Sequence, residues 1–211
     1  MKYKAILFDL DGTLVDSLED LTDAINDGLR RLRQPTQTPE QCREIIGRGR
    51  EHFVRQALPK DRQDLFETLL TTMTEYYDAH CCVKSRPYPG IETILPALKQ
   101  KGIRMAVISN KNHPQTEKIV THFFGRDTFD FICGMNDSRK AKPDPDMPQA
   151  ALRALSATPE QAILIGDGDT DMLAARAAGT ALGNLIDGHY TSLSGTSMAA
   201  PMVAAVAANT T

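Results

Sequence analysis

Two aspartates with one residue between them follow the first apolar run of the chain. Asp9 and Asp11 come directly after residues 3–8, and Gly12 then breaks the run into a loop. A carboxylate can attack phosphorus and carry the phosphoryl group. A second carboxyl group can protonate the departing alkoxide and then accept a proton from water. An isolated Asp-x-Asp pair is usually a turn, but directly after an apolar strand this pair is a candidate for phosphoryl transfer.

Further polar clusters follow later apolar runs. They comprise Ser109, Asn110 and Lys111, then Lys140 and Lys142, and then Asp167, Asp169 and Asp171. Carboxylates that gather in one place repel one another and need a hard cation, and Mg²⁺ accepts carboxylates together with phosphate oxygens. A metal ion and a lysine can also offset the repulsion between an attacking carboxylate and a phosphate. We therefore expect these clusters to meet in a Mg²⁺-dependent site.

The elements that must position these residues alternate after residue 90. Strands are expected over 103–109, 129–133 and 161–165, and helices over 91–101, 114–124, 146–156 and 169–178. Such alternation predicts a parallel sheet with right-handed crossovers, and ligands of such sheets bind at the carboxyl ends of the strands. Asp9, Ser109, Lys142 and Asp167 should therefore converge at one rim.

The segment between the first two strands is helical. Leu18, Leu21 and Ile25 begin an amphipathic repeat, Ser17 and Asp20 resemble a capping pair, and Thr38 before proline marks another helix start. We predict an α/β fold, with a Rossmann-like parallel sheet core and an inserted α-helical cap. The expected divisions are a core of 1–15 and 86–188, a cap of 16–85 and an atypical tail of 189–211.

Four segments resemble the ordered motifs of the haloacid dehalogenase-like hydrolase superfamily, and together they resemble its phosphoglycolate phosphatase branch over roughly residues 1–180. The segments are Asp9-Leu-Asp-Gly-Thr-Leu-Val-Asp-Ser, Val107-Ile-Ser-Asn-Lys, Lys142-Pro-Asp-Pro and Ile165-Gly-Asp-Gly-Asp-Thr-Asp. The resemblance implies that Asp9 is the nucleophile and a metal ligand. It also implies that Asp11 is the general acid/base and binds metal through its backbone carbonyl.

The same resemblance assigns the remaining positions. Asp167 is the second metal carboxylate, and Asp171 is the outer acidic residue. Ser109 and Asn110 are the phosphate-binding pair, and Lys142, rather than the competing Lys140, balances charge. Arg48 and Arg50 lie in the cap, where they either form a solvated loop or supply one arginine for a substrate carboxylate.

Composition limits the partners of the chain. The 211 residues are 41% hydrophobic and 24% charged, with a net charge of −3, so nothing draws the chain toward nucleic acid or a membrane. The first apolar run is too short for a signal peptide. The four cysteines lack metal-ligand spacing and are expected as free thiols. A cytoplasmic protein is expected, as a monomer or a dimer.

The end of the chain resembles another family. Gly195-Thr-Ser-Met-Ala-Ala-Pro201 is similar to the nucleophile segment of subtilisin-like serine proteases, with Ser197 as the nucleophile. A serine needs a base and an orienting acid, and the upstream segments that would supply them are missing. We expect a helix of small residues here rather than a working protease.

The leading hypothesis is a Mg²⁺-dependent phosphomonoester hydrolase. It would act through an aspartyl phosphate on a small phosphorylated metabolite such as 2-phosphoglycolate. The alternatives are a sugar phosphomutase of the same superfamily, a serine-protease-derived fragment and an inactive binding module. A dehalogenase is disfavoured by Asp11-Gly12-Thr13, which follows the phosphotransferase pattern.

Overall fold

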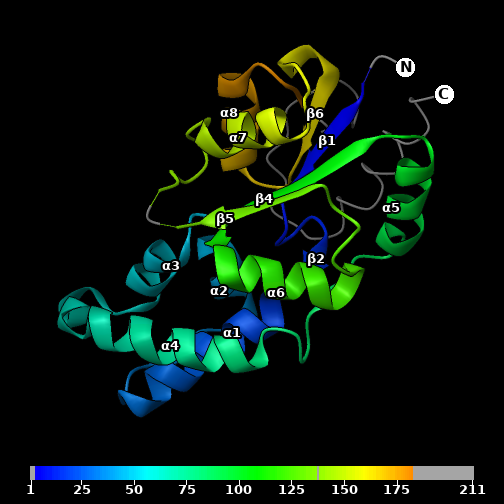
Figure 1. Cartoon of the computed structure of the whole chain (residues 1–211). Coiled ribbons are helices and arrows are strands. Elements are labelled where there is room, and N and C mark those ends of the chain that lie inside the picture. Colours follow the sequence, from blue (N-terminus) through cyan, green and yellow to red (C-terminus); the bar gives the residue numbers. More distant parts are fainter. Residues whose placement is uncertain (1–2, 137, 183–211) are drawn as a thin grey trace.

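A parallel β-sheet forms the centre of the computed structural model, which describes residues 3–136 and 138–182. The first strand, β1 (Ala5–Phe8), pairs on one side with β4 (Arg104–Asn112) and on the other with β6 (Ala162–Ile165). With β5 (Phe131–Met135) and β7 (Ala181–Leu182) at the edges, the five strands have the order β5-β4-β1-β6-β7, and every pairing is parallel (Figure 1). The predicted α/β fold class is confirmed.

Helices cover both faces of this sheet because neighbouring strand residues point to opposite sides. Ile6 and Phe8 pack with residues of α5 (Ile91–Gln100) and α6 (His113–Phe124). Ala5 and Leu7 pack with residues of α7 (Asp146–Ala154) and α8 (Asp169–Ala178). All four strand residues are fully buried. The sheet is thus buried on both faces, which explains its continuous apolar runs.

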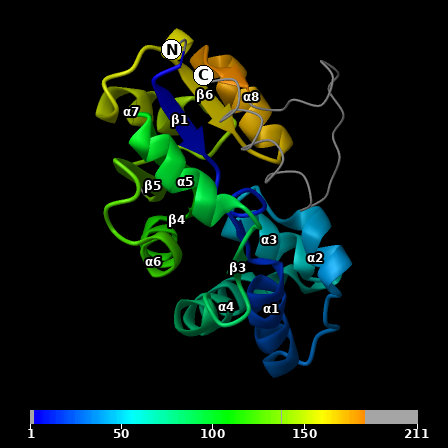
Figure 2. The same cartoon turned by 90° about the vertical axis from the view of Figure 1, so that its right-hand side faces the viewer.

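Four helices gather at one end of the molecule, beyond the strands (Figure 2). They are α1 (Leu18–Arg31), α2 (Pro39–Ile45), α3 (Arg50–Ala57) and α4 (Phe66–His80), with a 3₁₀ turn at Lys60–Leu65 before the last. α1 contacts both α2 and α4, and α3 contacts α2 and α4. A short antiparallel ladder of β2 (Val15–Asp16) and β3 (Arg86–Pro87) joins the two connections to the sheet. That these helices form a separable cap with limits at 16 and 85 stays a prediction.

The helix starts show where local patterns are reliable. Thr38 caps α2 as predicted: its hydroxyl accepts from the Gln41 backbone, and the Gln41 side chain reciprocates. Ser17 occupies the N-cap position of α1, but its side chain makes no capping hydrogen bond, so the predicted capping pair with Asp20 does not form. Its hydroxyl donates instead to Asp11, and Asp20 accepts from the backbone of Lys84 and Ser85. Contacts of Ser17 with Asp11, and of Asp20 with the backbone of Lys84 and Ser85, take the place of the predicted capping hydrogen bonds.

The remaining elements complete the sheet. β5 (Phe131–Met135) precedes α7, a 3₁₀ turn at Pro159–Gln161 precedes β6, and β7 (Ala181–Leu182) ends the described chain. The tail prediction, including Ser197, lies outside the described residues.

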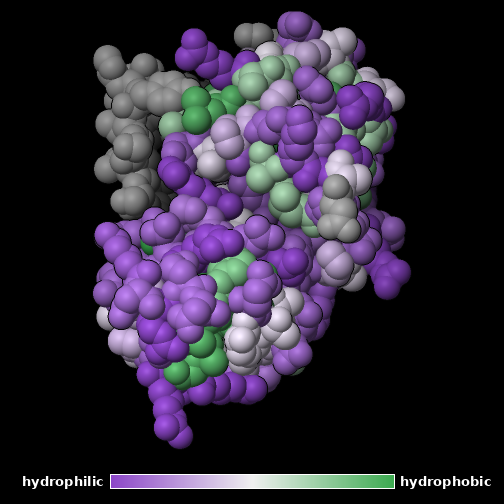
Figure 3. Space-filling model, turned by 90° about the vertical axis from the view of Figure 1, so that its left-hand side faces the viewer, coloured by the Kyte–Doolittle hydropathy of each residue, from purple (hydrophilic) through white to green (hydrophobic). Residues whose placement is uncertain are grey.

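The α-helices over 3–136 and 138–182 are all too short or too polar to cross a bilayer. The face in Figure 3 is mostly hydrophilic, with hydrophobic residues in small areas.

Candidate active site

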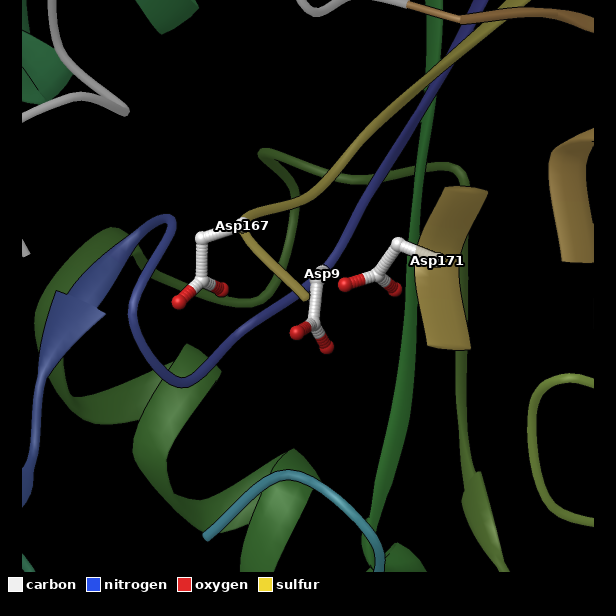
Figure 4. Close-up of side chains that lie close together, drawn as sticks. All are labelled: Asp9, Asp167 and Asp171. Atoms are coloured by element: carbon white, nitrogen blue, oxygen red, sulfur yellow. The ribbon is translucent and has the colours of Figure 1, made fainter. Parts of the chain in front are cut away.

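An acidic cluster lies at the carboxyl ends of β1 and β6. Asp9 follows β1, Asp167 follows β6, and Asp171 comes from the first turn of α8 (Figure 4). Each offers a carboxylate oxygen, and these oxygens all lie within 4.8 Å of one another. The predicted convergence of the first and fourth polar clusters is therefore present in the geometry.

This crowding changes the acidity of the cluster. Burial, followed by the charge of Asp171, holds the pKa of Asp9 well above its usual range. The same two causes raise the pKa of Asp167 to about 6, although part of its surface reaches solvent. The carboxylates therefore lack sufficient positive charge among the protein groups alone. Clustered carboxylate oxygens with little counter-charge are the donor set that suits Mg²⁺, so these residues fit a hard divalent cation.

Lys142 supplies the positive charge that the protein contributes. Its ammonium lies 2.7 Å from Asp9 Oδ1 and 2.6 Å from Asp171 Oδ1, and it donates to the Ile108 carbonyl at 3.0 Å. Burial would lower the pKa of Lys142, but Asp171 and Asp9 outweigh it and raise this pKa. Lys140, the competing candidate, is exposed and pairs with Asp144.

Two glycines permit the close approach of the acidic loops. A Cβ atom at Gly12 would lie 2.3 Å from Asp167 Oδ2, and Gly12 has a φ of +82°, which other residues rarely adopt. A Cβ atom at Gly166 would lie 2.3 Å from Asp171 Cγ. The Thr13 hydroxyl donates to Asp167 at 3.2 Å. The Asp-Gly-Thr sequence thus places the backbone directly against the second acidic loop.

Ser109 and Asn110 both lie at the end of β4, but their side chains make different contacts. Ser109 is buried, and its hydroxyl accepts from the Lys111 backbone at 3.2 Å. The Asn110 carboxamide donates to the carbonyls of Gly47 and Lys142 at 3.0 Å each, and accepts from the Lys142 backbone at 2.7 Å. The Asn110 side chain therefore joins a loop of the helical region to the loop that carries Lys142.

Asp11 lies beside this cluster, where it meets a lysine to which the sequence gave no role. Its Oδ2 lies 3.0 Å from the Lys111 ammonium, and its Oδ1 accepts from Ser17. Lys111 also donates to the hydroxyl of Tyr77 in α4 at 2.8 Å. Burial, and then Asp11, raise the pKa of Tyr77. The available signal in the sequence was that Lys111 directly follows Ser109 and Asn110 in the second polar cluster. Its burial, which a lysine rarely shows without a partner, appears only in the structure.

A pocket opens beside Asp9 and Asp11, between the strand ends and the helical region. It encloses about 510 Å³ including its open mouth. Its lining comprises Asp9, Asp11, Leu21, Ile46, Gly47, Gly49, Arg50, Phe53, Met73, Ser109, Asn110, Lys111, Asn112 and Gln115. The two arginines that were candidates for binding a substrate carboxylate have different positions. Arg50 lines the pocket, whereas the Arg48 guanidinium pairs with Asp169 of the sheet region at 2.8 Å.

Comparison with known proteins agrees with this arrangement. Residues 6–183 match the family model described as haloacid dehalogenase-like hydrolase. The chain belongs to this family. The predicted family resemblance is thereby confirmed for the phosphatase-like part, while the subtilisin-like segment lies outside the described residues.

Similar members of the family have related names. A phosphoglycolate phosphatase of Aquifex aeolicus is 36% identical over 178 residues, which cover 84% of this chain and 82% of the relative. Phosphoglycolate phosphatase 1 of Pseudomonas aeruginosa is 33% identical and covers 88% of this chain and 70% of the relative. A crystal structure of a predicted phosphoglycolate phosphatase from Haemophilus somnus 129pt has a TM-score of 0.79 at 30% identity, covering 86% of this chain and 84% of that one.

Another similar structure was solved with a ligand. CbbY from Rhodobacter sphaeroides, in complex with phosphate, has a TM-score of 0.72 at 28% identity and covers 85% of this chain and 84% of that chain. The family likeness therefore extends over the sheet and the four helices beyond it, because both regions lie within the matched residues.

Proposed function

We propose that this hydrolase family member is a Mg²⁺-dependent phosphatase that cleaves small phosphate monoesters through an aspartyl phosphate on Asp9. The observation that carries the proposal is the acidic cluster, with carboxylate oxygens within 4.8 Å of one another and a lysine on two of them. The names of the similar family members support the same class of substrate.

The proposed reaction uses two carboxyl groups in turn. A carboxylate oxygen of Asp9 attacks phosphorus, and the bond to the alkoxide oxygen breaks as Asp11 gives that oxygen its proton. A water molecule then attacks the aspartyl phosphate, Asp11 takes the proton from the water, and inorganic phosphate leaves with Asp9 restored. Such acid–base assistance typically contributes about 10²–10⁴-fold to a rate.

A metal ion and Lys142 would together stabilise the negative charges of the carboxylates and the phosphoryl group. The proposed ligands are the carboxylates of Asp9, Asp167 and Asp171 and the backbone carbonyl of Asp11. When bound, Mg²⁺ supplies a Lewis acid that offsets the negative charge of the phosphoryl oxygens. Lys142 would hold the Asp9 carboxylate in place, and Ser109 and Asn110 would complete the proposed phosphate site at the end of β4.

The proposed substrate is a phosphorylated small acid such as 2-phosphoglycolate. The pocket beside Asp9 carries Arg50, and an arginine can bind a carboxylate through two parallel hydrogen bonds. We further propose that residues 16–85 act as a cap over this pocket, since Gly49, Arg50 and Phe53 of that segment line it. Closure of such a cap would exclude water from the first chemical step.

Phosphate release from a panel of small phosphate monoesters, with Mg²⁺ and with a chelator, tests the proposal. We expect release that requires Mg²⁺, favours acidic substrates and falls by several orders of magnitude in Asp9→Asn, which keeps the shape but removes the nucleophile. Asp127→Asn, at a turn remote from the cluster, is the matched control. An isomerised sugar phosphate in place of inorganic phosphate would indicate a mutase, and full activity of Asp9→Asn would refute the mechanism.

A further inference from the structure

A buried lysine connects the proposed acid–base residue to the helical region. The side chain of Lys111 is 5% exposed, and its ammonium lies 3.0 Å from Asp11 Oδ2 and 2.8 Å from the hydroxyl of Tyr77. Tyr77 belongs to α4 and is itself buried, and the same ammonium lies 4.5 Å from the centroid of its ring. Residues far apart in the sequence thus form one chain of contacts, from Asp11 through Lys111 to Tyr77.

The two oxygens of the Asp11 carboxylate have separate partners. Ser17 donates to Oδ1, and Lys111 lies against Oδ2. A carboxylate that is held at both oxygens cannot rotate without losing one of these contacts. Because the ion pair is largely shielded from water, its attraction is weakly screened. Lys111 therefore restrains the orientation of Asp11 more strongly than a surface lysine would.

The surroundings of Lys111 favour its pairing with Asp11 over other positions of the ammonium. Among the described residues, Asp11 is the acidic side chain within ion-pair distance of the Lys111 ammonium. A buried ammonium without a partner is costly, so Lys111 gains by remaining against Asp11. The Tyr77 hydroxyl accepts from the same ammonium and thereby limits where the lysine can move.

We propose that Lys111 is a positioning residue for Asp11, and that Tyr77 makes this positioning depend on the place of α4 over the sheet. With α4 in place, the Tyr77 hydroxyl and ring hold the ammonium, and the ammonium holds Oδ2 of Asp11. The proton that Asp11 gives and takes is then carried on Oδ1, to which the Ser17 hydroxyl donates only while Asp11 is ionised. Displacement of α4 removes the contact with Tyr77 and leaves Lys111 freer to move. Acid–base chemistry is thereby linked to closure over the pocket. The inference rests on the proposed function and adds a residue to it.

Lys111 also lines the pocket, so a direct contact with substrate is the competing role. The two roles differ in what they change. A contact with the non-phosphate end of the substrate would alter KM, and would do so according to the charge of that end. A positioning role acts through Asp11, so it alters the rate of proton donation according to how much the leaving group needs a proton.

The test measures release of the leaving group in a single turnover, with phenyl phosphate and with 4-nitrophenyl phosphate. Phenoxide is the more basic leaving group and needs the proton more. For Lys111→Met we expect a loss of at least about tenfold with phenyl phosphate, within the range of acid–base catalysis, and a much smaller loss with 4-nitrophenyl phosphate. Tyr77→Phe should show the same pattern more weakly. Equal losses for both esters, or a change confined to KM, would overturn the proposal.

Two matched controls separate positioning from simple loosening of the helical region. Lys118 of α6 also donates to that region, at the Asp78 carbonyl, whereas the described partners of Asp11 are Lys111 and Ser17. Tyr76 is the neighbour of Tyr77 and stacks on His80 instead. Lys118→Met and Tyr76→Phe should leave the ratio of the two rates unchanged. If either control reproduces the pattern, the effect comes from loosening, and the proposal fails.

A double-mutant cycle then asks whether Lys111 acts through Asp11. In the Asp11→Asn background, Lys111→Met should cause no further loss with phenyl phosphate, since interacting residues are not additive. Additive losses would overturn the inference. A crystal structure of Lys111→Met should show the Asp11 carboxylate rotated from its place. Failure of the wild-type protein to release any leaving group would refute the proposed function, whereas the outcomes named above refute Lys111 positioning in an active enzyme.

Discussion

The ammonium of Lys142 lies 2.7 Å from Asp9 Oδ1 and 2.6 Å from Asp171 Oδ1, so a single buried cation bridges two buried carboxylates. The side chain of Lys142 is 1% exposed, as is that of Asp171. Asp167 has no lysine of its own among the described ion pairs. Positive charge from Lys142 therefore falls on the Asp9 and Asp171 side of the acidic cluster, and Asp167 faces the position of the proposed metal ion.

Removal of Lys142 should destabilise the metal-free protein. Lys142→Met leaves buried carboxylates without a counter-charge, and breaking a buried pair from one side typically costs about 3–5 kcal/mol in the free energy of unfolding. Chemical denaturation in the presence of a chelator measures this change. Lys140→Met is the matched control, because Lys140 is exposed, and it should change stability by less than about 0.5 kcal/mol. Equal stability of the two variants would contradict the bridging role.

Gly12→Ala should damage the proposed metal site beyond its backbone cost. The added Cβ atom would lie 2.3 Å from Asp167 Oδ2, so either the loop or Asp167 must move. Gly125→Ala is a matched control, because Gly125 has a similar φ of +80° and no atoms within 4 Å of the new Cβ. Both variants should lose about 1–3 kcal/mol of stability from the strained backbone. We expect weaker Mg²⁺ binding, measured by calorimetry, in Gly12→Ala alone, and an unchanged affinity there would contradict the prediction.

Hydrophobic periodicity was sufficient to predict four of the five strands and the helices on the faces of the sheet, but not the short β7. The strand that carries the site was nevertheless predicted to end too early, at residue 109, whereas β4 continues to Asn112. Its polar residues resemble the end of a strand. They are buried in the fold because Asn110 meets Gly47 and Lys111 meets Tyr77, both from the helical segment. A local pattern cannot show burial that another segment provides.

Some residues of the candidate site could be placed from the sequence, and others could not. Asp9 and Asp167 could be placed together because parallel strands end at one rim, and the roles given to them stay predictions. The contact of Lys111 with Tyr77 and the pairing of Arg48 with Asp169 could not be foreseen, since they depend on how the helices lie against the sheet. At Ser17 the sequence predicted a capping hydrogen bond, but the Ser17 hydroxyl donates to Asp11 instead.

Stabilisation by Mg²⁺ should depend on pH. The pKa of Asp167 is raised to about 6 without metal, because burial and Asp171 disfavour its charge. A raised pKa in the folded state favours folding at low pH, and this contribution is lost as pH rises from about 4 through about 6. Mg²⁺ binds the charged form and should restore the loss. The gain in Tm on adding Mg²⁺ should therefore be larger at about pH 7 than at about pH 5. Asp167→Asn should reduce this difference, and equal gains at both pH values would contradict it.

Arg48 and Arg50 should differ in their effect on substrate selection. Arg50 lines the pocket, so Arg50→Ala should raise KM for a carboxylated phosphate monoester by about 10-fold or more, since charged hydrogen bonds are worth about 1.5–3 kcal/mol. A neutral aryl phosphate should respond much less. Arg48 pairs instead with Asp169, and both side chains are more than half exposed, at 56% and 53%. Exposed ion pairs contribute little, so Arg48→Ala should change KM for both substrates alike and only slightly. Steady-state kinetics of the two variants on both substrates gives the comparison. A selective rise in KM in Arg48→Ala, with none in Arg50→Ala, would mean that the Arg48–Asp169 pair opens on binding and that Arg48 is the arginine that contacts the carboxylate.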